Sequence, residues 1–294
     1  MSIFSRAQRI YTQRGWRRAA QFYWNAMRAG QTSHDWFKYL EYDFPATIPA
    51  EISAGLTAKI FRPYLRPRLN ATRRAEILRA HYDLYGAKIA ADKIPLLLEQ
   101  PGMRLAQLTG KSGATYSIYL GASTTKEGDA DIFYMDDRTG APLATLTGVF
   151  GPDGFYIGGL RGIKPPLGKA EIVFATRDMH GLRPKHAALH AVCAIARWFG
   201  AAQIIAPTQR NHITHRSFGK FGFHSREILA DYDAFWQEFT EARRADGDYI
   251  LPLELPRRDA AEVKSKKRGE WLKRQGYLDD MAAQVAETLK SLAK

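Results

Sequence analysis

The stretch EIVFATRDMHGLRPKHAALH, residues 171–190, decides the fold. Its first six residues, EIVFAT, form a short apolar run that is typical of a buried strand. An alanine-rich amphipathic run follows and ends at Gly200, and QIIAPT at residues 203–208 has the pattern of another buried strand. Strand, crossover helix and strand form a right-handed βαβ unit, so we expect these two strands to be parallel neighbours.

The start of this helix carries many hydrogen-bond donors. Proline suits a first helical turn because its missing N–H has no partner there, so we expect the helix to begin near Arg183 or Pro184. The amides of Lys185, His186 and Ala187 are then free and point outward with the positive end of the helix dipole. Together with the charges of Arg183 and Lys185, they predict a phosphate or pyrophosphate site. The alternative is a helix end whose basic residues are simply solvated.

The chain around this unit divides into three predicted regions. Residues 1–100 have helical spacing, with one helix ending at Gly30. Residues 101–225 begin with short runs rich in β-branched and aromatic residues, separated by turn signals at 111–113, 138–140 and 152–154, which predicts antiparallel hairpins. Residues 226–294 are again mainly helical and pack on the core, with LPLELP at 251–256 as a last strand. The predicted fold class is α+β with a mixed, mostly antiparallel sheet.

Composition limits the classes of function. The 294 residues carry a net charge of +13 and a pI near 9.8, which favours an anionic cofactor or substrate. The chain lacks zinc-finger spacing and RNP-type aromatic motifs, so we expect no dedicated nucleic-acid binding. The single cysteine, Cys193, fits a small buried filler. No apolar run approaches the ~20 residues of a membrane span, and arginines replace the apolar part of a signal peptide, so a cytoplasmic location is expected.

The N-terminal residues leave two interpretations open. They contain no acidic residue through His34 and are rich in arginine, with Phe4, Ile10, Tyr11 and Trp16 between the arginines. Such a segment either packs its aromatic side chains on the body of the protein or lies peripherally on the anionic face of the inner membrane.

The segment after the second predicted strand carries a resemblance. QRNHITHRSFGKFGF, residues 209–223, has an asparagine, a predicted short helix and a closing Gly-Phe. The order strand, Arg-x-x-x-x-Ala loop, helix, strand, Asn, short helix and Gly-Phe resembles the central part of the GNAT acyltransferase fold. The resemblance implies a GNAT-like mixed α/β core and acyl-CoA or an acyl carrier protein as cofactor. Five residues are the candidates for holding this cofactor: Arg183, Lys185, His186, Ala187 and Asn211.

Two positions depart from the pattern of that family. His186 stands where a glycine normally lets the backbone approach the pyrophosphate. Phe218 stands where a tyrosine often donates a proton to the leaving thiolate. Because phenylalanine has no proton to give, His212 or His215 is the predicted catalytic residue, since histidine titrates near neutral pH. If neither acts, the acyl chemistry is absent.

Four motifs carry a narrower resemblance. They are YIGGLRG at 156–162, HGLRPKHAAL at 180–189, YDAFWQE at 232–238 and RGEWLKRQ at 268–275. These are similar to motifs of the VirK/YbjX proteins of Gram-negative bacteria. The resemblance implies a bacterial protein associated with virulence and with envelope or antimicrobial-peptide resistance, and it implies no particular reaction.

These observations give one leading hypothesis and two alternatives. The leading one is a GNAT-like acyltransferase that moves an acyl group from an acyl thioester to an amine or hydroxyl. The first alternative is a non-catalytic GNAT-like protein that binds an anionic lipid, peptide or protein partner. The second is a metal-dependent enzyme built on His186 and His190, which share one helical face. No third ligand is evident, and His81 and Asp83 point apart at helical spacing, so we expect no metal.

Overall fold

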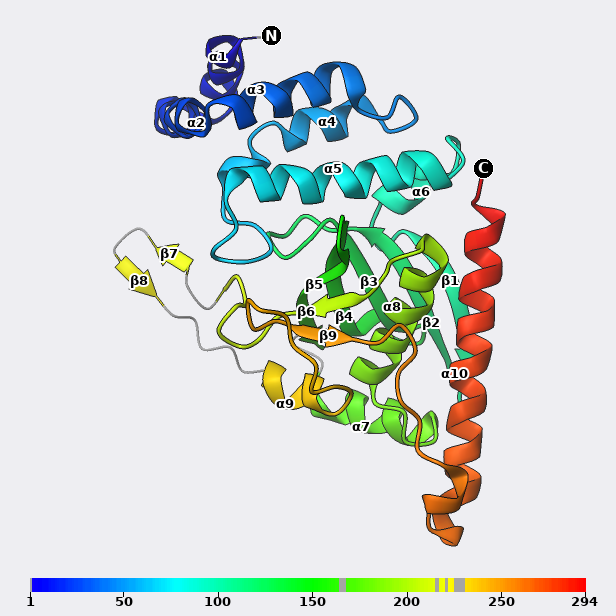
Figure 1. The fold of residues 1–294 in the computed structure, drawn as a ribbon. Coiled ribbons are helices and arrows are strands. Elements are labelled where there is room, and N and C mark those ends of the chain that lie inside the picture. Colours follow the sequence, from blue (N-terminus) through cyan, green and yellow to red (C-terminus); the bar gives the residue numbers. More distant parts are fainter. Residues whose placement is uncertain (1, 164–167, 215–216, 220–221, 225–230) are drawn as a thin grey trace.

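The centre of the molecule is a sheet whose first five strands follow one another through hairpins. The computed structural model describes residues 2–163, 168–214, 217–219, 222–224 and 231–294, and within them the main sheet has the order β1-β2-β3-β4-β5-β6-β9 (Figure 1). Each of the three predicted turns connects the two strands of an antiparallel hairpin, as expected. The strands are β1 (Met103–Thr109), β2 (Thr115–Ala122), β3 (Ala130–Asp136), β4 (Ala141–Gly151), β5 (Gly154–Gly162), β6 (Ile204–Ala206) and β9 (Tyr249–Leu251), with β7 (Ser217–Gly219) and β8 (Gly222–His224) forming a separate pair.

The parallel pair exists, but its first strand is not the one that the sequence predicts. EIVFAT lies within helix α7 (Lys169–Asp178), and the parallel partner of β6 is β5. The backbone N–H of Gly168 donates to Glu171 at 2.8 Å, which stabilises the start of α7. Val173 and Phe174 lie on the exposed side of this helix. A six-residue apolar run cannot by itself distinguish a strand from one side of a short helix.

Helices cover both ends of the chain, as predicted. Helix α2 ends at Gly30, whose φ of 53° lies in the left-handed region that glycine adopts without strain. Helix α8 ends at Gly200. The N-terminal helices are α1 (Ile3–Arg14), α2 (Trp16–Ala29), α3 (Gln31–Lys38), α4 (Ala50–Leu56), α5 (Ala71–Lys88) and α6 (Ile94–Leu98), with a π-helical turn at Tyr39–Asp43 and a 3₁₀ turn at Lys59–Phe61. The later helices are α7, α8 (Pro184–Phe199), α9 (Tyr232–Gln237) and α10 (Ser265–Ser291), with a 3₁₀ turn at Ala260–Glu262.

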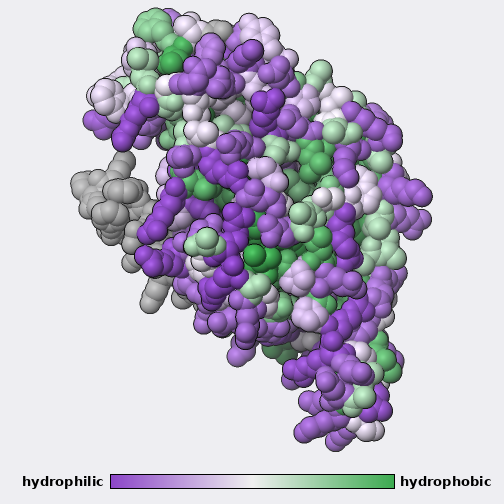
Figure 2. Space-filling view, in the orientation of Figure 1, coloured by the Kyte–Doolittle hydropathy of each residue, from purple (hydrophilic) through white to green (hydrophobic). Residues whose placement is uncertain are grey.

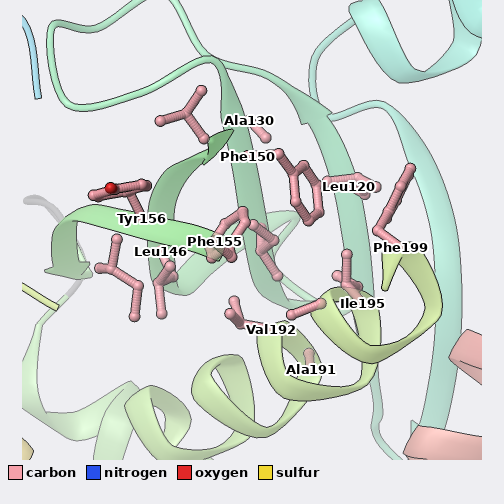
Figure 3. Close-up of a cluster of buried hydrophobic side chains, with 14 of the residues drawn as sticks. Leu120, Ala130, Leu146, Phe150, Phe155, Tyr156, Ala191, Val192, Ile195 and Phe199 are labelled. Atoms are coloured by element: carbon pink, nitrogen blue, oxygen red, sulfur yellow. The ribbon is translucent and has the colours of Figure 1, made fainter. Parts of the chain in front are cut away.

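One hydrophobic cluster joins these elements. Figure 3 shows Phe150 and Phe155 of the sheet pointing toward the α8 side chains, of which Phe199 lies 4.6 Å from Phe150 between ring centroids. Tyr85 of α5 stacks on the same Phe199 ring at 5.4 Å, so the N-terminal helices and α8 share this core. Each fully buried side chain of this size contributes about 1.5–3 kcal/mol. Helix α8 is therefore packed against the sheet, with its last residue, Phe199, in this core.

Two further predictions after β6 need correction. The last strand is Tyr249–Leu251, so it includes only the first residue of LPLELP. A short helix was predicted after Asn211, but residues 213–214 form a turn and Ser217–Gly219 form strand β7, while residues 215–216 lie outside the described part of the chain. Two prolines in LPLELP remove the N–H groups that a ladder requires, which explains the early end of the strand. Among the described residues, no helix has both the length and the apolar character needed to cross a bilayer.

Candidate functional site at the start of helix α8

Helix α8 begins where the sequence predicts. Arg183 is the N-cap residue, with an extended backbone, and Pro184 is the first helical residue. The amide of Ala187, which was expected to be free, donates to the Arg183 carbonyl at 3.0 Å, and the Ala187 side chain is buried. The amides of Lys185 and His186 precede it in the first turn, where helical N–H groups lack an intrahelical acceptor. Of the three expected amides, only those of Lys185 and His186 thus remain candidates for an anion site.

A cavity of about 700 Å³ opens beside this helix start, and we call it the apolar pocket. That volume lies within the range of small-molecule sites. Its walls come from the end of β5, from α7, from the first turn of α8 and from α9. The hydrophobic side chains that line it are Leu143, Ile163, Ile172, Val173, Ala234 and Phe235. The helix start thus faces a cavity with an apolar wall.

Lys185 is one of the cations that line the apolar pocket, together with Arg177 and Arg183. Its side chain is half-buried and lines the apolar pocket, close to Gly162 at the end of β5. Burial lowers the pKa of its ammonium group. Among the described residues, no carboxylate forms an ion pair with it. A partly desolvated cation of this kind is stabilised by an anion that enters the pocket.

A second cavity, of about 340 Å³, lies between α8, α10 and the chain at 256–258, and we call it the basic pocket. Its basic lining residues are Arg183, His186, His190, Arg257, Arg258 and Arg274. Burial lowers the pKa of Arg274, whose Nη1 donates to the Gly181 carbonyl at 3.4 Å. Arg257 pairs with Asp279 at 2.6 Å. The guanidinium fork suits phosphate and carboxylate ligands, so this pocket has the chemistry of an anion site.

Arg183, His186 and Glu238 line both pockets and form the wall between them. The Glu238 carboxylate accepts a hydrogen bond from Nη2 of Arg183, and one of its oxygens lies 3.3 Å from Nε2 of His186. Burial, with the nearby charges of Arg183 and Arg274, lowers the pKa of His186 to about 4. The imidazole is therefore neutral near pH 7, and its contact with Glu238 is not an ion pair.

A separate polar cluster surrounds His212, which was a predicted catalytic residue. His212 is buried, its Nε2 lies 3.6 Å from Oε1 of Glu127, and its Nδ1 lies 2.6 Å from the Thr214 hydroxyl. Arg161 lies beside Glu127 at 3.7 Å and donates to Thr147 at 2.6 Å. Burial raises the pKa of Glu127. His212 does not line either pocket, so the structure places it apart from Arg183, Lys185 and His186.

Glu127 and Arg161 were missed by the sequence analysis, although Gly158 and Gly159 gave a signal. A Cβ on Gly158 would lie 1.6 Å from the Glu127 carbonyl oxygen, and one on Gly159 would lie 2.5 Å from Oε2 of Glu127. The β4–β5 register also shifts at this point. The glycines therefore admit a loop of the protein itself to the strand, which explains the close approach without a ligand.

The remaining predicted residues lie elsewhere. Nδ2 of Asn211 donates to Oδ1 of Asp248 at 2.8 Å, and Asp248 pairs with Arg66 at 2.6 Å in a buried ion pair. Asn211 therefore links the segment after β6 to Asp248, and it does not line either pocket. His215 lies outside the described residues, as do the side chains of Phe218 and His224.

His81 and Cys193, two further candidates for metal or thiol chemistry, are both buried. In the part of the chain that the structure describes, no three His, Cys, Asp or Glu side chains lie close enough to hold a metal ion. His81 packs on Tyr85 with ring centroids 4.4 Å apart, while Asp83 accepts from Tyr39 at 2.8 Å, so the two point apart as helical spacing predicts. Cys193 is buried, and burial raises its pKa to about 12, as fits an inert filler.

Together, the fold and the two pockets define an α+β protein with a cavity of ligand size at the start of its central helix. The chain belongs to the family described as "Protein of unknown function (DUF535)", whose model matches residues 12–287. The predicted resemblance to the VirK/YbjX proteins is confirmed. An uncharacterized protein YbjX of Escherichia coli strain K12 is 36% identical over 237 residues, which cover 79% of this chain and 71% of that protein.

A more distant relative is similar over a comparable length. An uncharacterized protein of Haemophilus influenzae strain Rd is 24% identical over 232 residues, which cover 79% of this chain and 76% of that protein. A second uncharacterized protein of the same organism is 30% identical over 115 residues, covering 39% of this chain and 36% of its own. No solved structure matches this fold.

Proposed function

We propose that this chain is an acyltransferase that takes an acyl thioester into the two pockets and transfers the acyl group to an amine or hydroxyl. The observation that carries the proposal is the shared wall: an apolar pocket and a basic pocket meet at Arg183, His186 and Glu238. An acyl thioester of phosphopantetheine has the matching division, because an apolar chain and an anionic phosphate flank one thioester. Coenzyme A and acyl carrier proteins both present this arm.

The two ends of the donor have separate partners in this scheme. The acyl chain lies along Ile172, Val173 and Phe235 in the apolar pocket, where its burial gives roughly 0.8 kcal/mol per CH₂ group. The phosphate lies near Arg258 and Arg274, the guanidinium groups of the basic pocket. The amides of the first turn of α8 add the positive end of the helix dipole.

His186 is the residue best placed to move the proton. The attacking amine or hydroxyl forms a bond to the thioester carbon, its proton passes to the neutral imidazole, and the C–S bond breaks. The thiolate then takes the proton and leaves as the thiol. A phosphate that draws Arg183 away from Glu238 leaves the carboxylate to His186 alone, which raises the pKa of the imidazole toward the neutral range where a base works best.

The strand order also supports an acyltransferase of the GNAT kind. Strands β5 and β6 pair in parallel only at Phe155–Ile204 and Tyr156–Ile205, and β5 continues to Gly162 beside the start of α8. The chain between the two parallel strands contains α7 and α8, and α8 has the place of the helix that precedes the second strand in the resemblance. The setting that we propose is envelope or antimicrobial-peptide modification, as the VirK/YbjX resemblance implies.

Non-catalytic binding of an anionic lipid, peptide or protein is the second candidate, and two observations favour it. Glu238 already occupies Arg183, and the Tyr232 hydroxyl accepts from the Leu160 amide at 2.9 Å on the free part of the β5 edge. Both contacts fill positions that a thioester arm would otherwise take, so a ligand that needs only the pockets also fits.

Calorimetry with a long-chain acyl-CoA, coenzyme A, free fatty acid and an acyl carrier protein thioester tests the proposal. We expect the thioesters to bind more tightly than coenzyme A or the fatty acid, and Arg258→Met to weaken binding roughly tenfold by removing one cation from the basic pocket. Lys290→Met on the exposed end of α10 is the matched control and should bind as the wild type does.

A thiol-release assay with amine and hydroxyl acceptors separates the two candidates. Buried Cys193 does not compete for the thiol reagent in the folded protein. Thiol release that His186→Ala abolishes while binding persists supports the acyltransferase. Binding without release supports the non-catalytic protein, and failure of every thioester to bind contradicts the acyltransferase.

A further inference from the structure

Helix α2 exposes an aromatic stripe that the core does not use. Trp16, Tyr23, Trp24 and Met27 are 65%, 41%, 70% and 55% exposed. At 100° per residue these four side chains fall within about 100° of the helix circumference. Scattered single exposed hydrophobic residues are ordinary, but two tryptophans, a tyrosine and a methionine on one stripe are not.

The buried side of α2 is a different one. Ala19, Phe22 and Ala26 are buried, and Phe22 packs on Phe37 and Phe61 with ring centroids 6.2 and 5.5 Å apart. Anchoring of the helix to the body is thus complete without the aromatic stripe. The aromatic stripe is thus a second apolar side of the helix, and it faces away from the body of the protein.

Basic residues accompany the stripe. Arg17 and Arg28 lie at the edge of the stripe next to Trp24 on the helical wheel. Six arginines and no acidic residue occur in residues 1–34. Figure 2 shows hydrophobic atoms reaching the surface over α1 and α2, among strongly hydrophilic side chains. Helix α1 adds Phe4 and Tyr11, which are exposed and seven residues apart on one side of that helix.

We infer that helix α2, with α1 beside it, docks this protein on a lipid bilayer that carries anionic headgroups. Tryptophan and tyrosine side chains are favoured at the boundary between headgroups and acyl chains, because each has an apolar body and a polar end. Each arginine near an anionic surface adds roughly 1 kcal/mol, equivalent to about fivefold in affinity. The aromatic stripe and the arginines at its edge supply both parts of an interfacial helix.

The arginines beside the aromatic stripe favour a membrane, and not a second copy of this chain, as the partner that covers the stripe. A symmetric contact through the stripe would bring the same arginines of two chains together without an acidic partner, whereas phospholipid headgroups neutralise them. Figure 1 places α2 at the opposite end of the molecule from α7 and α9, so docking leaves the apolar pocket open to solvent. The inference therefore does not depend on the proposed function.

Vesicle co-sedimentation of the full chain tests this inference, using phosphatidylcholine alone and phosphatidylcholine mixed with phosphatidylglycerol. We expect binding to the anionic vesicles, a blue shift of tryptophan emission on binding, and loss of both at high salt because salt screens the arginines. Trp16→Ser with Trp24→Ser should weaken binding roughly tenfold or more, since the stripe no longer enters the interface. Leu272→Ser, at an exposed apolar residue of α10, is the matched control.

A charge series completes the test. Arg17→Glu with Arg28→Glu should weaken vesicle binding roughly tenfold or more, whereas Lys266→Glu with Lys267→Glu changes the net charge equally and should leave binding unchanged. Circular dichroism shows that each variant keeps its fold. The inference is overturned if anionic vesicles do not bind, if the tryptophan variants bind as well as the wild type, or if sedimentation velocity without lipid shows a dimer that these variants dissociate.

Discussion

The Arg183 guanidinium at the start of α8 is held by the Glu238 carboxylate, which follows α9 in the chain. The cation that the sequence assigns to an anionic ligand thus has an internal partner. Both side chains are substantially exposed, so the pair by itself contributes little to stability, about 0–1 kcal/mol. Its main consequence is for binding, because an anion at this corner must compete with Glu238 for Arg183.

Replacement of Glu238 by glutamine should strengthen anion binding. The change removes the competing charge and leaves the shape of the side chain, so we expect the affinity for pyrophosphate or coenzyme A to rise roughly tenfold by calorimetry. Glu241→Gln, at a nearby exposed acid, removes the same charge from the surface and should change affinity little. Equal effects of the two substitutions would mean that only net charge matters and that Arg183 takes no part.

The glycine at position 158 should be intolerant of any side chain. Its Cβ would lie 1.6 Å from the Glu127 carbonyl oxygen, and backbone atoms cannot move aside cheaply. We expect Gly158→Ala to lower the free energy of unfolding by roughly 3 kcal/mol or more in urea titrations. Gly269→Ala is the matched substitution, because that glycine lies within α10 with open space around it. It should stabilise the protein by about 1 kcal/mol.

Asp129 should be the most sensitive carboxylate in the contact between the N-terminal helices and the sheet. It accepts from Lys59 at 2.7 Å, from Tyr82 at 2.7 Å and from Tyr64, and it is buried. Burial alone would raise its pKa, but Lys59 and the hydroxyl donors hold the pKa below its usual range. Asp129→Asn leaves Lys59 without its counter-ion, and we expect a loss of about 3–5 kcal/mol in unfolding free energy.

A surface carboxylate provides the comparison for Asp129. Asp92 pairs with Lys93 at 2.9 Å, but its side chain is 70% exposed. Asp92→Asn should therefore leave the free energy of unfolding close to that of the wild type. A loss for Asp129→Asn as small as this would mean that the buried cluster does not join the helices to the sheet.

The sequence predicted the parts of the fold that depend on local signals. Gly30, Gly200 and Pro184 end or begin helices for reasons of backbone conformation, and the hairpin turns follow from their glycines. EIVFAT was misassigned because its apolar run is short, and the side that it exposes depends on contacts far along the chain. Since α7 lines the apolar pocket, the nature of that wall could not be predicted either.

The sequence predicted only those residues of the candidate site that lie in one continuous segment. Arg183, Lys185 and His186 are adjacent in sequence, and the proline beside them places them at a helix start. Glu238 lies 55 residues from Arg183 in the sequence and Arg274 lies 93 from Gly181, and both reach this corner through contacts that no local pattern records. The cluster of Glu127, Arg161 and His212 is also assembled by tertiary contacts, with Gly158 and Gly159 as its local signal.

His81 should make the protein less stable as the pH falls below neutrality. The side chain is buried, its Nδ1 has no hydrogen-bond partner among the described residues, and burial lowers its pKa from 6.5 to about 4. Between these two values the unfolded chain binds the proton and the folded chain does not, so stability is lost as the pH falls from about 6.5 toward 4. A difference of this size corresponds to at most about 3 kcal/mol.

Substitution of His81 by phenylalanine isolates this contribution. The ring lies stacked against Phe150 at 6.0 Å and close to Tyr85, so a phenylalanine fits an aromatic environment and removes the titrating group. Urea unfolding at a series of pH values should show that His81→Phe loses less stability than the wild type between neutral and mildly acidic pH. The lowered pKa values of His186 and His190 affect both proteins equally and cancel in the difference. His34→Phe, at an exposed position, should leave the slope unchanged, and identical slopes for His81→Phe and wild type would show that the buried imidazole takes up its proton without unfolding.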